Sequence, residues 1–267
     1  MKQMLTMKQM KSAVMGRYLL SGLGLAVCVA LSSTQAMADT VLGGYVGIQA
    51  WNVAAQGGFA QNESLATFKF KDETNTSFYA ALEHPIPLIP NIKLVRTTLN
   101  TSGSNVIDSP FNFGDQVFLV SATISTEVKL SATDYILYYE ILDNDLISID
   151  IGISGKQLDG DVFVADIDGR SSQQNIDAII PMGYGKMQVG LPFTGFSLTA
   201  EGTFLAIDDD SFTDYQLALA YSFIETLALD LSIQIGYRAT ELDLNDVDGI
   251  YADLQFDGAF IGLEFDF

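Results

Sequence analysis

The sequence predicts an all-β protein, an antiparallel up-and-down transmembrane β-barrel of ten strands, and three observations lead to this prediction. A short apolar run preceded by basic residues opens the chain, as in an export signal. The rest of the chain alternates apolar and polar residues with a period of two, which is typical of strands. The last six residues, GLEFDF at 262–267, alternate in the same way and end on an aromatic residue. We expect this last strand to pair with the first, because an open sheet edge in lipid would leave backbone groups without hydrogen bonds.

Residues 1–38 are expected to be a cleaved signal peptide, and residues 39–267 the barrel. Four basic residues precede an apolar run at 19–31, and AMA at 36–38 supplies the small-residue cleavage pattern. The run is too short for a membrane-spanning helix, which needs about 20 residues. Cys28, the only cysteine, lies inside this segment. The mature chain is therefore expected to hold no disulfide bond.

Composition agrees with a barrel and excludes one class of partner. Cleavage at residue 38 removes four of the 13 basic residues and none of the 33 acidic ones, so the net charge changes from −20 to −24. The chain is also 48% hydrophobic. High apolar content together with high charge fits an apolar outer belt around a polar interior. A chain this acidic has no basic patch to neutralise phosphates, so nucleic acid is not an expected partner.

The strands are expected near residues 41–53, 65–83, 91–101, 115–140, 146–160, 172–189, 196–207, 212–224, 228–243 and 250–267. The phase of the alternation changes near residues 131–133 and at Gly258, and we interpret both changes as β-bulges. Pro181 fits the sixth strand poorly because it lacks an N–H. Eight strands are the alternative if two of the longer segments are divided differently.

Two kinds of connection alternate along the chain. Short or proline-bearing ones, at residues 84–90, 142–145, 190–195 and 225–226, are expected to be periplasmic turns. Longer polar ones, at residues 54–64, 102–114, 159–171, 208–211 and 244–249, are expected to be outer loops. Aromatic residues near the ends of the apolar faces, Tyr45 and Trp51 among them, are expected to form an interfacial girdle.

Three segments resemble a known family. They are GGYVGIQAWN at residues 43–52, EHPIPLIPN at 83–91 and YYEILDN at 138–144. The chain resembles a family of small outer-membrane β-barrel proteins of Gram-negative bacteria that has no assigned activity. The resemblance implies a barrel in the outer membrane and supplies no catalytic or ligand residues. The closing strand, with Gly262, Phe265 and Phe267, also resembles the C-terminal signal read by the barrel-assembly machinery, although Phe260 stands where that signal usually has a polar residue.

The sequence gives little basis for catalysis. His84 is the only histidine and lies in a proline-rich turn, where we expect a structural role. A catalytic serine needs a base to accept its proton, usually a histidine. A histidine-and-cysteine metal centre is excluded by the number of such residues. No cofactor and no catalytic residue is predicted.

Carboxylates are the remaining candidates, in the outer loops and on the lumen side of the strands. Asp208, Asp209, Asp210, Asp246 and Asp248 are expected in solvated outer loops, with weak divalent-cation binding as the alternative. Such cations would bridge the acidic loops to anionic lipopolysaccharide. The lumen candidates are Lys93, Asp150, Glu201, Asp230, Arg238 and Glu264. They are expected either to pair in an interior network or to line a narrow path for cations.

The sequence therefore predicts a monomeric barrel of the Gram-negative outer membrane with a structural or surface-contact role. Outer-membrane lipids, lipopolysaccharide and the barrel-assembly machinery are the expected partners. A small cation-preferring pore is the second candidate, and an enzyme acting on lipid or peptide is the third.

Overall fold

The computed structural model describes residues 42–60, 65–108, 110–144, 146–207, 210–226, 229–247 and 250–267, although the side chains of residues 206, 207, 210, 244–247 and 250 are not described. The expected signal peptide, with Cys28, lies outside these residues. No helix in the described ranges is long and apolar enough to span a membrane.

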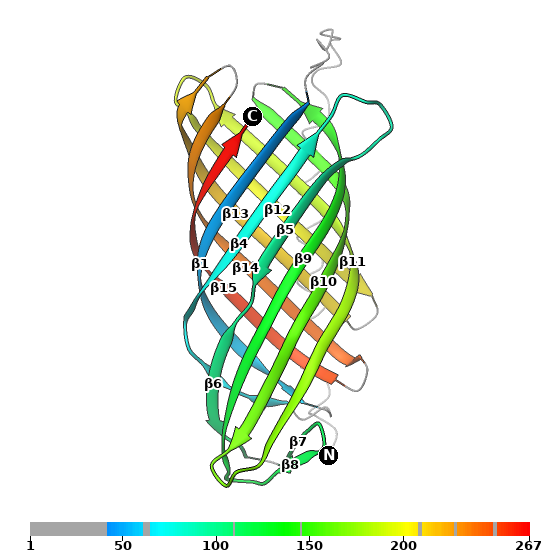
Figure 1. Ribbon diagram of the computed structural model, residues 1–267, viewed down its shortest axis with the longest axis vertical. Helices are drawn as coiled ribbons and strands as arrows, with labels where there is room; N and C mark the ends of the chain where they lie inside the picture. The colour runs from blue at the N-terminus through cyan, green and yellow to red at the C-terminus, as the bar shows by residue number, and fades with distance from the viewer. Residues whose placement is uncertain are drawn as a thin grey trace, which may run out of the picture. The chain divides into compact units, whose positions relative to one another are not determined.

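The described residues form fifteen strands, several of which are pieces of one longer strand (Figure 1). They are β1 (Gly43–Ala60), β2 (Ala66–Thr67), β3 (Lys69–Phe70), β4 (Glu73–Glu83), β5 (Asn91–Thr98), β6 (Thr101–Val106), β7 (Phe111–Phe113), β8 (Gln116–Phe118), β9 (Thr123–Asp143), β10 (Ile147–Asp166), β11 (Ser171–Leu191), β12 (Phe196–Ile207), β13 (Asp210–Glu225), β14 (Asp230–Val247) and β15 (Ile250–Asp266). β5 and β6 pair with β9 in one continuous register, so together they make one strand of the wall.

The sheet closes on itself as a ten-stranded antiparallel barrel. Its order is β10-β11-β12-β13-β14-β15-β1-β4-β5-β9, and β9 pairs with β10 to complete the circle. The last strand pairs with the first from Tyr45 opposite Asp266 to Ala60 opposite Tyr251. Gly44 and Phe267 also exchange two backbone hydrogen bonds of 2.9 Å. The predicted fold class, the strand number and the pairing of the last strand with the first are confirmed.

Both described chain ends lie at one end of the barrel, which we call the terminal end, and β7 and β8 lie at the opposite, far end (Figure 1). The wall strands are longer than expected, because β9, β10 and β11 contain 21, 20 and 21 residues. The predicted outer loops were therefore partly wrong, because a strand extends into each of the five: β6 covers residues 102–106, β13 begins at Asp210 and β14 ends at Val247. Residues 54–60 continue β1, and residues 159–166 continue β10. Pro181 fits within β11 because β12 pairs only from Gly183 onward, so Pro181 has one neighbouring strand, β10.

The two phase changes are not bulges, and this part of the sequence interpretation was wrong. Pairing runs without interruption through residues 131–133 of β9, and through Gly258 of β15 on the side of β14. On the side of β1, Gly258 and Ala259 are not paired, but the register is the same before and after them, so no residue is inserted. The only irregularity in the described pairing of β9 lies near its end, where Leu142 and Glu140 face consecutive residues of β10. What changes along each strand is the environment. In β9, Tyr135 and Leu137 face outward near the terminal end, whereas Ile124 and Val128 face inward near the far end.

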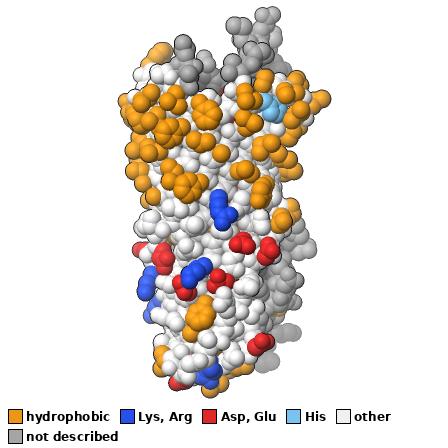
Figure 2. Space-filling model, viewed as in Figure 1, with side chains coloured by type: hydrophobic (Ala, Val, Ile, Leu, Met, Phe, Trp, Pro, Cys, Tyr) orange, Lys and Arg blue, Asp and Glu red, His pale blue; other side chains and the backbone are white. Residues whose placement is uncertain are grey.

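The terminal half of the barrel therefore carries an apolar outer surface, and the far half a polar one (Figure 2). We call the exposed apolar side chains of the terminal half the belt. Its members include Val46, Ile48, Phe78, Leu82, Ile92, Leu94, Tyr135, Leu137, Tyr139, Ile151, Ile153, Leu198, Tyr215, Leu217, Tyr237, Ile261 and Leu263. Tyr45 and Trp51 were expected here, but both are buried inside the barrel, 6% and 1% exposed. Inward positions alternate with belt positions, and both residues occupy inward ones.

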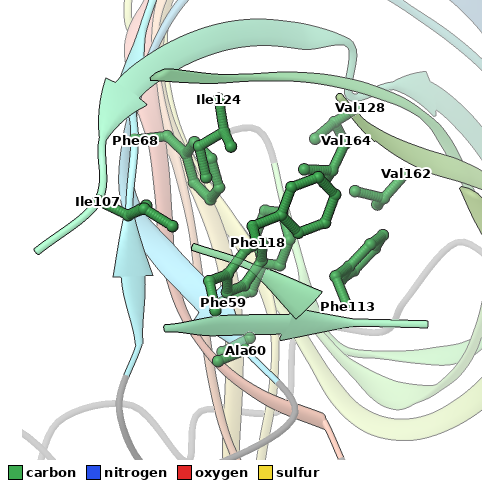
Figure 3. Packing of buried hydrophobic residues seen from close by; sticks show 12 residues of the cluster. Phe59, Ala60, Phe68, Ile107, Phe113, Phe118, Ile124, Val128, Val162 and Val164 are labelled. Carbon is green, nitrogen blue, oxygen red and sulfur yellow. The ribbon is translucent and has the colours of Figure 1, made fainter. Parts of the chain in front are cut away.

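The far half is filled by an apolar core. The β7–β8 hairpin folds in so that Phe111, Phe113 and Phe118 contact Phe59 and Val164 (Figure 3). The Phe59 ring stacks on Phe68 at 4.9 Å and lies 5.4 Å from Phe113. We call these residues the far-end core.

The turn from β10 to β11 lies in the far half and is held by an ion pair. Arg170 Nε donates to Asp166 Oδ2 at 2.6 Å, and the backbone amides of Asp168 and Arg170 donate to Asp166 Oδ1. Burial alone would raise the pKa of the Asp166 carboxyl, but the bonds from Arg170 outweigh this effect and hold the pKa below its usual value.

Candidate functional site

The inside of the terminal half is polar, because the strand positions that alternate with the belt carry charged, amide and hydroxyl side chains. These inward residues come from strands all around the barrel wall. The largest group is centred on Asp214 of β13, and a second one is centred on Glu201 of β12.

Asp214 accepts hydrogen bonds from two basic residues. Arg238 Nε and Nη2, from the adjacent β14, lie 2.9 and 2.7 Å from its two oxygens, which is a bidentate pair. Lys156 Nζ, from β10, lies 3.0 Å from Asp214 and 2.7 Å from Asp134 of β9. Arg238 Nη1 also donates to Thr97 of β5 at 3.1 Å. These five residues, which we call the Asp214 cluster, connect opposite parts of the wall.

Glu201 is held by residues from three other strands. Lys93 Nζ of β5 lies 2.5 Å from Glu201 Oε1, and this ion pair also crosses the interior, since β5 and β12 are four strands apart by the shorter path. The Tyr184 hydroxyl donates to Oε1 at 3.0 Å, and Gln216 Nε2 donates to Oε2 at 3.0 Å. We call these four residues the Glu201 cluster.

The ion-paired charges inside the terminal half balance. Four basic side chains, Lys93, Lys156, Lys186 and Arg238, pair with four acidic ones, Asp134, Asp150, Glu201 and Asp214, and Lys186 Nζ lies 3.8 Å from Asp150. A charged side chain that is removed from water without a partner strongly destabilises the fold, so each of these charges needs the partner that it has. The interior of the terminal half is therefore a paired network with a cavity of about 40 Å³ between its members.

A second cavity, of about 180 Å³, opens at the terminal end and is acidic. Its walls include Glu83, Glu140, Asp143, Glu264 and Asp266, with Lys186 as the basic residue among them. Three of these carboxylates accept bonds from neutral donors: Glu83 from Tyr138 at 2.7 Å, Glu264 from Tyr79 at 2.7 Å and Glu140 from Asn91 at 3.0 Å. The surplus of negative charge inside the barrel is thus confined to this mouth.

The structure brings together four of the six predicted lumen residues and places two elsewhere. Lys93 and Glu201 pair directly, Asp150 pairs with Lys186, and Arg238 joins Asp214. Glu264 lines the acidic mouth. Asp230 is exposed at the first residue of β14, where it accepts a hydrogen bond from the Thr226 amide.

The predicted cation-binding aspartates cannot be placed, because Asp208, Asp209 and Asp248 lie outside the described residues and the side chains of Asp210 and Asp246 are not described. No group of three or more acidic, histidine or cysteine side chains suited to a metal ion occurs among the residues that are described. Of the predicted assembly residues, Gly262 faces inward between Gln49 and Gln234, while Phe265 and Phe267 are exposed beside the first strand.

Sequence reasoning missed Asp134, Lys156, Lys186 and Asp214. Each has the same parity as an inward residue of its own strand: Asp134 with Ile136, Lys156 with Asp150, Lys186 with Tyr184 and Asp214 with Gln216. Parity was therefore a usable signal. Continuing the inward parity along the full length of each strand would have found these residues, and for Asp134 this includes the phase change at residues 131–133.

His84 forms local hydrogen bonds and has no acid–base partner among the described groups. Its Nε2 lies 3.2 Å from the Pro90 carbonyl, and its Nδ1 accepts from the Ile86 amide at 3.3 Å. These bonds close the turn between β4 and β5 on itself.

Comparison with known proteins assigns no role to this chain. Neither known family models nor curated protein sequences match the chain. Among solved structures, it is similar to the attachment invasion locus protein Ail of Yersinia pestis, with 12% identity over 84% of this chain and 99% of that one and a TM-score of 0.34. It is also similar to the outer membrane protease OmpT of Escherichia coli (9% identity, 86% and 98% covered, TM-score 0.40) and to the transport unit of the autotransporter AIDA-I of Escherichia coli (7%, 87% and 92%, 0.39). At these identities and scores, none of the three carries an argument about what this chain does.

Proposed function

We propose that this chain is a non-conducting, monomeric β-barrel of the Gram-negative outer membrane, and that its role is structural or surface contact. The observation that carries this proposal is the filled interior. Ion pairs cross the terminal half, and the far-end core fills the other half with side chains as large as Phe111 and Phe118, which are 2% and 0% exposed. A path for ions would have to open both layers.

The division of the outer surface supports the location. A belt of exposed apolar side chains around a closed barrel is favourable in lipid and unfavourable in water. Since both chain ends of an even-stranded barrel of this kind belong on the periplasmic side, the terminal end, which holds both described chain ends, is assigned to the periplasm. The polar far half then projects from the cell surface as a rigid cylinder.

Surface labelling tests this placement. The mature chain is expected to lack cysteine, so single cysteines can be introduced without background. Asp177→Cys, on the polar outer face of β11, is expected to react with a membrane-impermeant maleimide on intact cells, whereas Ile153→Cys, in the belt, is expected to stay unlabelled until the membrane is dissolved. The reverse pattern would contradict the assigned orientation and depth.

Planar-bilayer recording tests the non-conducting role against the second candidate. The purified protein is expected to give no discrete channels, because Lys93, Lys156 and Arg238 block the interior as paired charges. The acidic mouth is what favours a cation-preferring pore. Regular cation-selective openings from the wild-type protein would establish the pore and overturn the proposal.

An enzyme acting on lipid or peptide is the third candidate, and it is tested separately. Unchanged lipid A and lysophospholipid profiles after overexpression are the expected result. A new lipid species that depends on the protein would replace the structural role by a catalytic one.

A further inference from the structure

Arg96 of β5 is an exposed arginine on the outer wall with no acidic partner. It stands between Phe78 of β4 and Thr133 of β9 in the cross-strand register, at the level where the belt ends. Its Nη1 donates to Thr133 Oγ1 at 3.2 Å, and its Nη2 donates to Ser131 Oγ at 3.3 Å. No carboxylate of the described residues lies within 4.0 Å of it, in a chain with a large excess of carboxylates.

These two hydroxyl bonds fix the guanidinium without neutralising it. A guanidinium has five N–H donors in a planar fork, and two of them are used here, so three remain for an anion. The fork suits a phosphate group, which can accept two parallel bonds. The Thr133 hydroxyl beside it adds a further donor, whereas the Ser131 hydroxyl donates to the Asp159 carbonyl at 3.3 Å. Arg96 is thus pre-oriented for a phosphate on the outer surface of the barrel.

An apolar groove begins directly below Arg96, toward the terminal end. It has a volume of about 530 Å³ and is lined by Val46, Ile48, Phe78, Leu94 and Phe265 around the small Ala80. Ala80 faces outward between Val46 of β1 and Leu94 of β5, and its missing bulk creates the hollow. In Figure 2, hydrophobic side chains cover this part of the surface. The groove lies within the belt, so a hydrocarbon chain is its expected occupant.

The place of Arg96 along the barrel decides which lipid supplies both groups. Under the proposed orientation the terminal end is periplasmic, so the far edge of the belt lies in the outer leaflet. The lipid of that leaflet in Gram-negative bacteria is a phosphorylated, multiply acylated glycolipid. Its phosphates lie at the level of the belt edge and its acyl chains below them, which is the arrangement of Arg96 and the groove.

We propose that Arg96 and the groove around Ala80 form a binding site for lipid A, in which the guanidinium holds a phosphate and the groove holds an acyl chain. The site needs no divalent cation, in contrast to the bridging expected from the acidic loops. The proposal rests on the outer-membrane placement proposed above.

The test measures binding of bisphosphorylated lipid A to the purified, refolded protein in detergent micelles by native mass spectrometry. Arg96→Gln is expected to weaken binding about tenfold, since hydrogen bonds to a charged group are lost. Lys129→Gln is the matched control, because it removes the same charge from the neighbouring strand, where Lys129 is paired with Glu127. It is expected to bind as the wild type does. Dephosphorylated lipid A is expected to bind the wild type and Arg96→Gln equally weakly.

A second pair of variants tests the groove without touching the arginine. Ala80→Leu fills the hollow and is expected to weaken lipid A binding at least about fourfold, as one displaced methylene group would. Ala200→Leu makes the same change at an outward position of β12 and is expected to have no effect. Neither change alters the interior, so both proteins are expected to fold.

Three outcomes would overturn the site. The first is that Arg96→Gln and the wild type bind lipid A with equal affinity. The second is that Lys129→Gln loses as much affinity for lipid A as Arg96→Gln does. The third is that inorganic phosphate or phosphatidylglycerol competes for the site as strongly as lipid A does. In each case a heat-modifiable, non-conducting barrel would leave the proposed function intact. Conductance or failure of surface labelling would instead count against the proposed function, so the two failures are distinguishable.

Discussion

Replacing Asp214 with alanine is expected to destabilise the barrel by about 3–5 kcal/mol, because it removes one partner from a buried ion-pair network. Arg238 would lose the two bonds of 2.9 and 2.7 Å that now satisfy it, and Lys156 would keep only Asp134. Urea unfolding in micelles measures the change, and Trp51 serves as the reporter because it is the chain's only tryptophan and is buried.

The control and the coupled variant make this prediction specific. Asp253→Ala removes an exposed carboxylate from the outer face of β15 and is expected to change stability little. Asp214→Ala with Arg238→Ala removes both members of a pair, so it is expected to be less destabilising than the sum of the single changes. Additive losses would mean that the two side chains do not stabilise each other, and the paired-network account of the interior would then be wrong.

Replacing Phe118 with alanine is expected to cost about 3–5 kcal/mol as well, through a different mechanism. Phe118 is fully buried in the far-end core, with its ring 5.8 Å from that of Phe111, and truncation leaves a cavity under the β7–β8 hairpin. The hairpin is expected to become accessible to added protease on intact cells, while the belt half stays protected. Urea unfolding and the rate of cleavage within residues 111–118 measure the two effects.

Val117→Ala is the matched control for this variant. Val117 is the preceding residue on the same short strand, but it is 52% exposed. It is expected to change the unfolding midpoint slightly and to leave the hairpin protected. Equal effects at the two positions would show that the hairpin rests on the barrel without contributing to its core.

The strands of the barrel wall could be predicted from the sequence because alternate residues of each strand face opposite sides of the wall. Residues 229–238 illustrate this, since their odd residues all point outward in β14. The sequence was misleading where the surroundings change along one strand. At residues 131–133 the apolar residues of β9 change from the inner to the outer face along the chain, without any irregularity in the pairing. In a sequence, a β-bulge and a change of environment along a strand produce the same shift in the apolar pattern. Only the pairing register of the strands distinguishes the two.

The interior network was harder to predict for a related reason. Lys93 and Glu201 are 108 residues apart and meet only because β5 and β12 face each other across the closed barrel. Parity could assign each to the inner face, but which inner residues share a level depends on the stagger of ten strands. The acidic count of the chain suggested surplus carboxylates in the lumen. The described interior instead balances its charges, and the surplus lies at the terminal mouth and on the outer wall.

The reversal of polarity along the wall strands also fixes how deeply the protein sits in its bilayer. A shift by two residues along a strand is about 6.6 Å. A shift in one direction would draw Arg96, Thr133 and Gln157 into hydrocarbon, where a charged side chain costs about 2–4 kcal/mol at mid-depth. A shift in the other direction would expose Tyr135 and Leu217 to water. The cylinder therefore has one favourable immersion depth, and a bilayer of a different thickness must thin or thicken around it, because the barrel cannot slide to meet it.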